Sequence, residues 1–269
     1  MPSDTVNPRP IALLGSTGNT GSAVLRSLLT RGTHDLHIYV RSVAKLETLF
    51  PGISLNPKVT IFTGSAKDHN VVKRCIEGSE LIICTLGSND YTPTTILSDS
   101  ARSIIDALRE LKEKEESWRR PRMVYLSSSS KNKKFAAQRP PVVNWLIQTA
   151  FSAGYADLAV AEKLLTAEPE LVDLLRVQPG VLVEEEGTGM AIDTDAVKLA
   201  CSYEDLGRAC VVLALDREYD ALHEIGVSSK GGDRALRYAP IILSRLSGGL
   251  FIVFCSKLAR VLGMLVGRS

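Results

Sequence analysis

The sequence predicts an α/β protein whose central sheet is mostly parallel and covered by helices on both faces. Short, wholly apolar runs alternate with segments of helical periodicity, and a glycine-rich turn follows the first of these runs. Hydrophobic residues make up 45% and charged residues 23% of the 269 residues, which is ordinary for a globular protein. Together these features indicate a doubly wound sheet of the Rossmann type.

The clearest unit covers residues 9–41. An apolar run at 11–14 leads into the glycine-rich turn, and Val24, Leu25 and Leu28 then follow helical spacing before a second apolar run at 37–40. This order of strand, helix and strand predicts a βαβ unit.

The alternation continues along most of the chain. We predict further strands at 59–62, 81–84, 123–126 and 174–177, and helices at 43–50, at 71–76, in a long segment ending near 116, and at 142–166. No repeat or linker divides the sequence, so we predict a single domain over 1–269, in which residues 180–269 contribute a smaller substrate-side part.

An apolar tail occupies residues 240–266. Arg245, Lys257 and Arg260 interrupt it, and its longest uncharged run, 246–256, has 11 residues. A helix needs about 20 apolar residues to span a bilayer, so we predict no spanning segment. The tail predicts a helix with a wide apolar face, covered by the substrate pocket or core, by a second copy in a homodimer, or by a membrane surface.

Composition excludes several classes of function. The net charge is only +2, and no basic stripe with interleaved aromatic residues is present, so we predict no nucleic-acid partner. The five cysteines contain no CxxC pair and the four histidines are dispersed, so we predict neither a disulfide framework nor a metal site. The first ten residues lack the apolar segment of a signal peptide, and we expect a cytoplasmic protein.

The glycine-rich turn is the strongest functional signal. Between the first predicted strand and helix the sequence reads Gly15-Ser16-Thr17-Gly18-Asn19-Thr20-Gly21. Glycines here let backbone N–H groups and the helix N-terminus approach a pyrophosphate. We therefore predict a dinucleotide site, with a plain strand-to-helix turn as the alternative.

The residue that ends the second strand indicates which dinucleotide binds. An acid at this position favours the ribose hydroxyl of NAD, whereas here Arg41 is followed by Ser42. A guanidinium pairs well with the 2′-phosphate, so NADP(H) is the predicted cofactor, although Arg41 is also explained as a surface arginine. Gly87 and Ser88, after the fourth strand, are expected near the adenine-side ribose or the pyrophosphate, or form an ordinary turn.

Several segments together resemble a known family. They are GSTGNTG after the first strand, Arg41-Ser42, the run VYLSSS ending at Ser129, AEKLL at 161–165, LRVQPG at 175–180 and SYEDLGRA at 202–209. The chain in this way resembles the atypical short-chain dehydrogenase/reductases, the NmrA-like NAD(P)-binding proteins. The resemblance implies a Rossmann fold. It also implies one of three functions, because the family includes NADPH-dependent reductases, redox-neutral isomerases or cyclases, and cofactor sensors without activity.

The wider superfamily uses a Tyr-x-x-x-Lys pair, in which the tyrosine protonates the carbonyl oxygen and the lysine assists it. Here Tyr155 is followed at the fourth position by Ala159, and the next lysine is Lys163. Eight helical residues separate the two side chains by about 12 Å, which is too far for direct assistance unless the helix starts later.

The resemblance therefore leaves the catalytic group open. Tyr155 is the preferred proton donor, with a half-buried aromatic beside a helix cap at Asp157 as the alternative. Ser128 and Ser129 are substitute hydroxyls, or they satisfy only the loop backbone. Lys131 or Lys163 supplies the cation, although Lys131 is also explained as part of a solvated group with Lys133 and Lys134.

Three further residues are expected at the cofactor. Ser127, Pro179 and Val181 are expected beside the nicotinamide because strand ends of this family pass close to it. The acidic run at 184–186 is expected to form either a mobile loop over the site or a solvated turn.

The predicted function is that of an NADPH-dependent oxidoreductase. Its expected substrate is a moderately large, apolar carbonyl or quinone-like natural product, reduced in a dry pocket. A redox-neutral isomerase or cyclase is the first alternative because the Tyr-x-x-x-Lys spacing is missing, and a non-catalytic NADP-sensing protein is the second.

Overall fold

The computed structural model describes residues 9–87, 91–116 and 118–266. Its strands are β1 (Ile11–Leu14), β2 (Leu36–Val40), β3 (Val59–Thr63), β4 (Leu81–Cys84), β5 (Arg122–Leu126), β6 (Asp173–Pro179), β7 (Val181–Val183), β8 (Met190–Asp193), β9 (Ala200–Ser202) and β10 (Glu224–Ser229). Its α-helices are α1 (Asn19–Arg31), α2 (Val43–Leu49), α3 (His69–Ile76), α4 (Ile96–Lys114), α5 (Lys133–Ala136), α6 (Pro141–Ala150), α7 (Ser152–Thr166), α8 (Tyr203–Leu215) and α9 (Ala235–Val266). The described residues also form three 3-10 helices, η1 (Ile53–Leu55), η2 (Ser129–Lys131) and η3 (Arg217–Tyr219).

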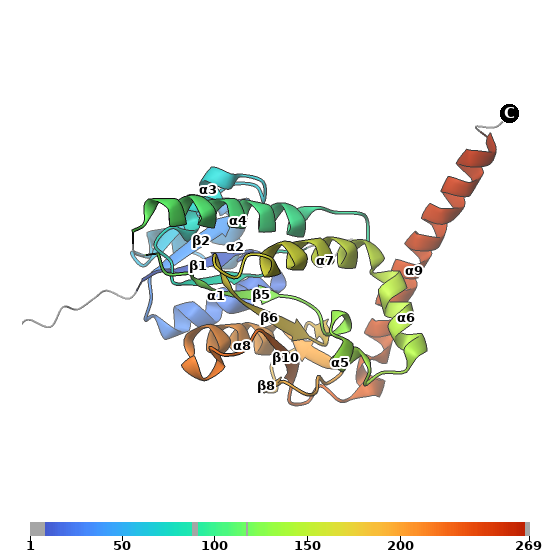
Figure 1. Ribbon diagram of the computed structural model, residues 1–269. Coiled ribbons are helices and arrows are strands. Elements are labelled where there is room, and N and C mark those ends of the chain that lie inside the picture. Colours follow the sequence, from blue (N-terminus) through green and yellow to red (C-terminus); the bar gives the residue numbers. More distant parts are fainter. Residues whose placement is uncertain (1–8, 88–90, 117, 267–269) are drawn as a thin grey trace, which may run out of the picture.

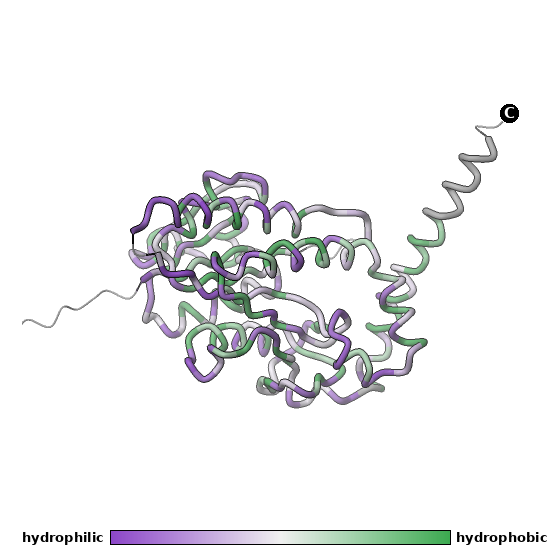
Figure 2. The backbone as a smooth tube through the Cα atoms, in the orientation of Figure 1, coloured by the Kyte–Doolittle hydropathy of each residue, from purple (hydrophilic) through white to green (hydrophobic). Residues whose placement is uncertain are grey.

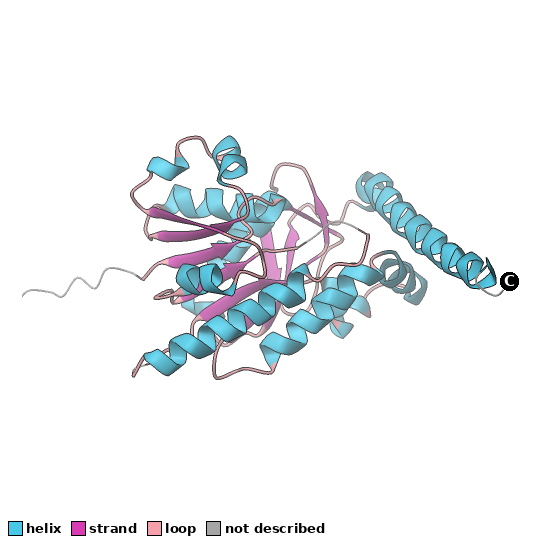
Figure 3. Ribbon diagram, turned by 90° about the horizontal axis from the view of Figure 1, so that it is seen from above, coloured by secondary structure: helices cyan, strands magenta, loops and turns pink. Residues whose placement is uncertain are grey.

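The main sheet confirms the predicted fold class. Its strand order is β3-β2-β1-β4-β5-β6-β10-β8, and only the β10–β8 pairing is antiparallel. The first six of these strands follow the doubly wound order, which reverses direction between β1 and β4. Helices lie on both faces of the sheet (Figures 1 and 3).

Alternation along the strands divides the core in two. Ile11 and Leu13 of β1 belong to a cluster that includes α1 and α8, whereas Ala12 and Leu14 belong to the opposite cluster with α3, α4 and α7. Strands buried on both faces must be apolar at every position, which is why these runs were recognisable in the sequence.

Two features differ from the predicted outline. The helix expected at 142–166 is two helices, α6 and α7, which meet at Phe151 with φ −108° and ψ 22°. After Pro179, β10 and β8 extend the main sheet and α8 packs on α1, while β7 and β9 form a separate two-stranded sheet. Part of the C-terminal third therefore completes the core.

The apolar tail is the single long helix α9, which packs on α6 and then projects from the body (Figure 1). Where Figure 2 colours α9, hydrophobic residues are frequent along it. Within the described residues, the window Leu236–Cys255 is the one stretch long and apolar enough to cross a membrane by length and composition. The sequence-based expectation of no spanning segment depends on the interruptions at Arg245, Lys257 and Arg260, whereas this window tolerates its two arginines, Arg237 and Arg245.

Candidate functional site

The glycine-rich turn forms a cradle at the edge where β1 and β4 end side by side. Gly15 has φ +96°, and an added Cβ would lie 2.9 Å from the backbone nitrogen of Leu86. A Cβ on Gly21 would lie 2.0 Å from the carbonyl oxygen of Gly15. Side chains at both positions would fill the space between the turn, β4 and α1, so the local fold requires glycine here.

The start of α1 has the properties of an anion site. Gly18 is the N-cap residue without a side-chain capping bond, and the first turn contains no acid. The backbone N–H groups of a first helical turn have no partner inside the helix and attract negative charge.

A buried hydroxyl in the same turn points to a missing partner. Ser16 Oγ is fully buried and has no hydrogen-bond partner among the described residues. A pyrophosphate fits this cradle, because it would satisfy both the Ser16 hydroxyl and the free N–H groups. Thr17 and Asn19 lie on the open side of the turn, and Thr20 is buried beneath it.

The residues predicted at the ribose occupy the neighbouring strand end. Arg41 is exposed immediately after β2. Ser42 caps α2, where its hydroxyl accepts a hydrogen bond of 3.2 Å from the Lys45 N–H. Gly87 is exposed after β4, whereas Ser88 lies outside the described residues.

The acidic run lies next to the phosphate cradle. Glu184 Oε1 accepts a hydrogen bond of 3.0 Å from Asn19 Nδ2. The next residue, Glu185, pairs with Arg237 of α9. The segment 184–186 therefore connects the glycine-rich turn with α9.

Removing the carboxylate of Glu184 should strengthen cofactor binding. In a Glu184→Gln variant, we expect the Kd for NADPH to fall about two- to fivefold because a negative charge near the phosphates is lost. Calorimetric titration checks this value. Glu186→Gln, in the same run and also exposed, is the matched control, and equal effects in both variants would contradict a local role for Glu184.

A second group of polar side chains gathers after β5. Ser128 Oγ and Tyr155 Oη lie 3.3 Å apart. The Lys131 ammonium lies 5.9 Å from the centroid of the Tyr155 ring. The structure thus brings together three of the five predicted catalytic residues. Ser128 and Lys131 lie in the segment that follows β5, and Tyr155 lies in the first turn of α7.

Neighbouring serines hold this group in place. Ser127 Oγ donates a hydrogen bond of 2.5 Å to Glu162 Oε1 of α7, which ties the end of β5 to the helix that carries Tyr155. Ser129 is buried and lies 3.5 Å from Arg139 Nη2, and Ser130 Oγ accepts from Arg139 Nη1 at 3.2 Å.

Arg139 is a functional candidate that the sequence did not reveal. Burial lowers the pKa of its guanidinium, and the neighbouring Tyr155 opposes that shift. Among the described residues Arg139 forms no ion pair with a carboxylate, so its charge faces the hydroxyl cluster. No motif marks this arginine; only the hairpin of η2, α5 and α6 places it there.

Lys163 lies apart from this cluster. It is exposed two turns further along α7, in a shallow depression shared with Arg176. Asp157 also has another role: its carboxylate accepts hydrogen bonds from the Leu97 and Ser98 N–H groups at 2.8 and 3.0 Å. It therefore caps α4 rather than its own helix.

The end of β6 passes on the other side of the same region. Pro179 is buried at the end of this strand, and Val181 is half-buried at the start of β7. Beside them, the buried Gln178 accepts a hydrogen bond of 2.8 Å from Asn132, which follows η2. This hydrogen bond joins the segment after η2 to the end of β6, and these two segments flank the predicted nicotinamide position.

Aromatic side chains extend from Tyr155 toward α9. The Phe151 ring lies 6.1 Å from that of Tyr155 and 5.6 Å from that of Tyr91. Tyr91 Oη donates a hydrogen bond of 3.0 Å to the Arg245 carbonyl oxygen. The break at Phe151 therefore creates an aromatic wall of Tyr91, Phe151 and Tyr155.

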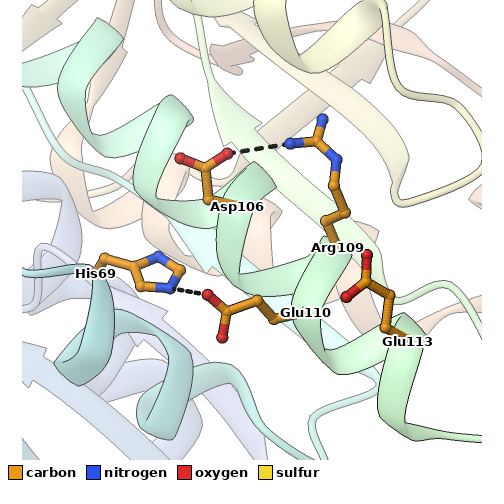
Figure 4. Close-up of a pocket in the computed structure, with 5 residues that line it drawn as sticks. All are labelled: His69, Asp106, Arg109, Glu110 and Glu113. Atoms are coloured by element: carbon orange, nitrogen blue, oxygen red, sulfur yellow. Dashed lines mark hydrogen bonds and ion pairs between the residues drawn. The ribbon is translucent and has the colours of Figure 1, made fainter.

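A charged depression between α3 and α4 is a separate feature (Figure 4). It is lined by His69, Asp106, Arg109, Glu110 and Glu113. Lys73, and to a smaller extent His69, lowers the pKa of Glu110 through hydrogen bonds, and the His69–Glu110 distance is 2.8 Å. Three carboxylates would repel a phosphate, so the depression does not fit the cofactor. Across the described parts of the chain, no three His, Cys, Asp or Glu side chains are grouped to hold a metal ion.

Comparisons with known sequences support a nucleotide-binding role. A model of the NAD(P)H-binding family matches residues 15–217. "Oxidoreductase aflX" from Aspergillus parasiticus is 32% identical over 249 residues, which cover 91% of this chain and 92% of that protein. "Oxidoreductase ordB" from Dothistroma septosporum is 34% identical over 218 residues, which cover 81% of both proteins.

Solved structures show the same fold. A short-chain dehydrogenase/reductase from Veillonella parvula in complex with NADP has a TM-score of 0.63 at 16% identity, and the match covers 84% of this chain and 96% of that one. A second structure of a short-chain dehydrogenase/reductase from that organism has a TM-score of 0.65 at 18% identity.

Proposed function

This chain belongs to the NAD(P)H-binding family and is an oxidoreductase with a short-chain dehydrogenase-like fold, and from that premise we propose that it uses NADPH to reduce a moderately large, apolar carbonyl or quinone-like compound. Membership agrees with the resemblance seen in the sequence. The observation that carries the proposal is the contact between Ser128 and Tyr155, with the Lys131 ammonium over the tyrosine ring.

The chemistry follows from these side chains. When bound, the reduced nicotinamide supplies a hydride to the carbonyl carbon. The Tyr155 hydroxyl donates its proton to the carbonyl oxygen, and Ser128 holds that oxygen by a hydrogen bond. Lys131 and Arg139 then stabilise the negative charge left on Tyr155 until it regains a proton from solvent. Lys131 thus takes the part of the lysine that the superfamily places four residues after its tyrosine.

The aromatic wall supports the substrate class. Tyr91, Phe151 and Tyr155 offer flat apolar surfaces beside the hydroxyl pair. A planar, apolar substrate would bury its rings against them and leave only its reactive oxygen facing Tyr155.

Arg41 should determine the preference for NADPH. We expect Arg41→Asp to weaken NADPH binding about a hundredfold, because the variant loses a charge-assisted contact and gains repulsion of the 2′-phosphate. NADH, which lacks that phosphate, should bind within a fewfold of wild type and serves as the internal control. Parallel calorimetric titrations measure both, and an unchanged preference would remove Arg41 from the site.

Direct titration tests the function itself. The purified protein is titrated with NADPH, NADP⁺ and NADH, and the absorbance of the reduced nicotinamide is then followed with a panel of ketones and quinones. Tight NADPH binding with cofactor consumption supports the proposal. If the protein binds none of the three nucleotides, the proposed function is contradicted.

One observation favours a second function. Ala159 occupies the position of the superfamily's lysine, and Lys163 is too distant to replace it. A redox-neutral isomerase or cyclase would need the Tyr155 and Ser128 hydroxyls but no hydride. NADPH binding without consumption, together with conversion of a substrate, identifies that activity.

A further inference from the structure

We propose that the protein attaches to anionic membrane surfaces through the outer part of α9 and the neighbouring exposed face of α6. This inference rests on the exposure, anchoring and charge of these helices and does not depend on the proposed reaction.

Large apolar side chains are exposed along one side of α9. Leu243, Phe251 and Phe254 are 65%, 68% and 67% exposed, and their spacing of eight and three residues places them on one helical face. At the same end of the molecule, Val142 and Trp145 of α6 are 61% and 63% exposed. Exposed apolar side chains that gather in one region of a protein commonly mark an interaction surface.

The inner part of α9 is fixed to the body. A Cβ on Gly249 would lie 2.5 Å from the Ala150 carbonyl oxygen, so the two helices cross in close contact. Arg245 Nη1 donates a hydrogen bond of 2.7 Å to the Leu182 carbonyl oxygen, which holds the preceding turn. The exposed face is therefore presented on a rigid support, and the helix leaves the body beyond this crossing (Figures 1 and 3).

Burial excludes the two ordinary explanations of such a helix. Only 17% of the window Leu236–Cys255 is buried, so α9 is not a core helix. The window lies in the C-terminal part of the chain, so it is not an N-terminal signal sequence.

The geometry favours a helix lying in the membrane surface over one that crosses it. The segment beyond the crossing, Leu250–Val266, contains Lys257 and Arg260 near its middle. A helix that crossed the membrane with this segment would place both cations in the hydrocarbon core, which is unfavourable. Interfacial helices combine this kind of apolar face with cations that reach the headgroups.

Charge identifies a membrane, rather than a second copy, as the surface that covers this face. From residue 235 to the end, the sequence has no Asp or Glu. Arg237 pairs with Glu185 and Arg245 donates to the Leu182 carbonyl oxygen, so the body of the protein holds both of these cations. Beyond the crossing the sequence contains Lys257 and Arg260, and a second copy of this segment would offer them no carboxylate, whereas anionic lipids attract each cation.

Vesicle flotation with the full-length protein tests the proposal. We expect binding to vesicles of phosphatidylcholine with phosphatidylserine, weaker binding to phosphatidylcholine alone, and release as ionic strength rises. The double variant Phe251→Ser/Phe254→Ser should bind about a hundredfold more weakly, because each phenylalanine contributes about tenfold. The matched control is Leu55→Ser, which removes an 87%-exposed leucine from η1, far from α9.

Cys255 gives a second readout without a new substitution. It is exposed on α9, whereas Cys75, Cys84, Cys201 and Cys210 are buried. Burial raises the pKa of Cys75, Cys84 and Cys210 to about 12, so a thiol-reactive dye selects Cys255. The emission of an environment-sensitive dye should shift to shorter wavelength with the anionic vesicles. The same dye on Leu55→Cys in a Cys255→Ser background should not shift.

The outcomes separate the alternatives. Absence of binding to anionic vesicles overturns the proposal, as does equal binding of the double variant and wild type. Light scattering that shows a wild-type dimer and a monomeric double variant, without vesicle binding, would assign the face to a second copy instead. Thermal unfolding of each variant confirms an intact fold. NADPH titration of the same samples keeps a failure of the proposed enzyme distinct from a failure of membrane attachment.

Discussion

Replacing Tyr155 by phenylalanine is expected to lower kcat about a hundred- to ten-thousandfold for any carbonyl compound that the wild type reduces. The substitution removes only the hydroxyl, which lies 3.3 Å from Ser128 Oγ, and keeps the ring that packs against Phe151. NADPH affinity should therefore change less than twofold, since no interaction with the nucleotide is assigned to that hydroxyl. Single-turnover absorbance measurements and calorimetry provide the two values.

Two lysine variants locate the assisting cation. Lys131→Met should lower kcat by about tenfold or more because the charge beside the Tyr155 ring is lost. Lys163→Met removes an exposed lysine of the same charge from the same helix as Tyr155, and should leave kcat nearly unchanged. A larger loss of kcat in Lys163→Met than in Lys131→Met would assign the assisting role to Lys163 instead. Full activity in Tyr155→Phe would move the proton donor to Ser128 or to the substrate.

Replacing Gly21 by alanine is expected to weaken NADPH binding by at least about a hundredfold. The new Cβ would lie 2.0 Å from the Gly15 carbonyl oxygen, and backbone atoms on both sides prevent a simple side-chain adjustment. The turn must open, which displaces the N–H groups of α1 from the pyrophosphate. Overpacking of this kind should also reduce the free energy of unfolding by about 1–3 kcal/mol.

A glycine in open space is the matched control. A Cβ on Gly154 would meet no atom within 4 Å, and this residue lies inside α7. Gly154→Ala should bind NADPH normally and increase the free energy of unfolding by up to about 1 kcal/mol. Thermal unfolding and calorimetry on both variants distinguish loss of the cradle from loss of the fold. Normal NADPH affinity in Gly21→Ala would refute the cradle.

Local patterns predicted the sheet and the tight glycine-rich turn between β1 and α1 because both depend on neighbouring residues. Strands buried on both faces are continuous apolar runs, and a turn that must bring Gly21 against Gly15 requires glycine at both positions. The resemblance to the atypical dehydrogenases, together with these patterns, identified the fold from the sequence.

Contacts between distant segments were not predictable in the same way. The break at Phe151, inside a segment of continuous helical periodicity, is stabilised by packing with Tyr91, 60 residues earlier. Asp157 resembles a local cap, yet its carboxylate serves α4. Arg139 carries no motif and reaches the serines only because α5 and α6 fold back on η2. Such roles arise from topology, which residue spacing does not encode.

The adjacent residues Glu184 and Glu185 connect the glycine-rich turn with α9, so a movement of this segment would reach both of them. Glu184 holds Asn19 of the phosphate cradle, and Glu185 holds Arg237 of α9, so one peptide bond joins the two contacts. If occupancy of the cradle changes the position of this segment, the free energy of that change is shared with α9. Linkage is reciprocal. If NADPH changes the affinity of α9 for a membrane surface by some factor, binding to that surface changes the affinity for NADPH by the same factor.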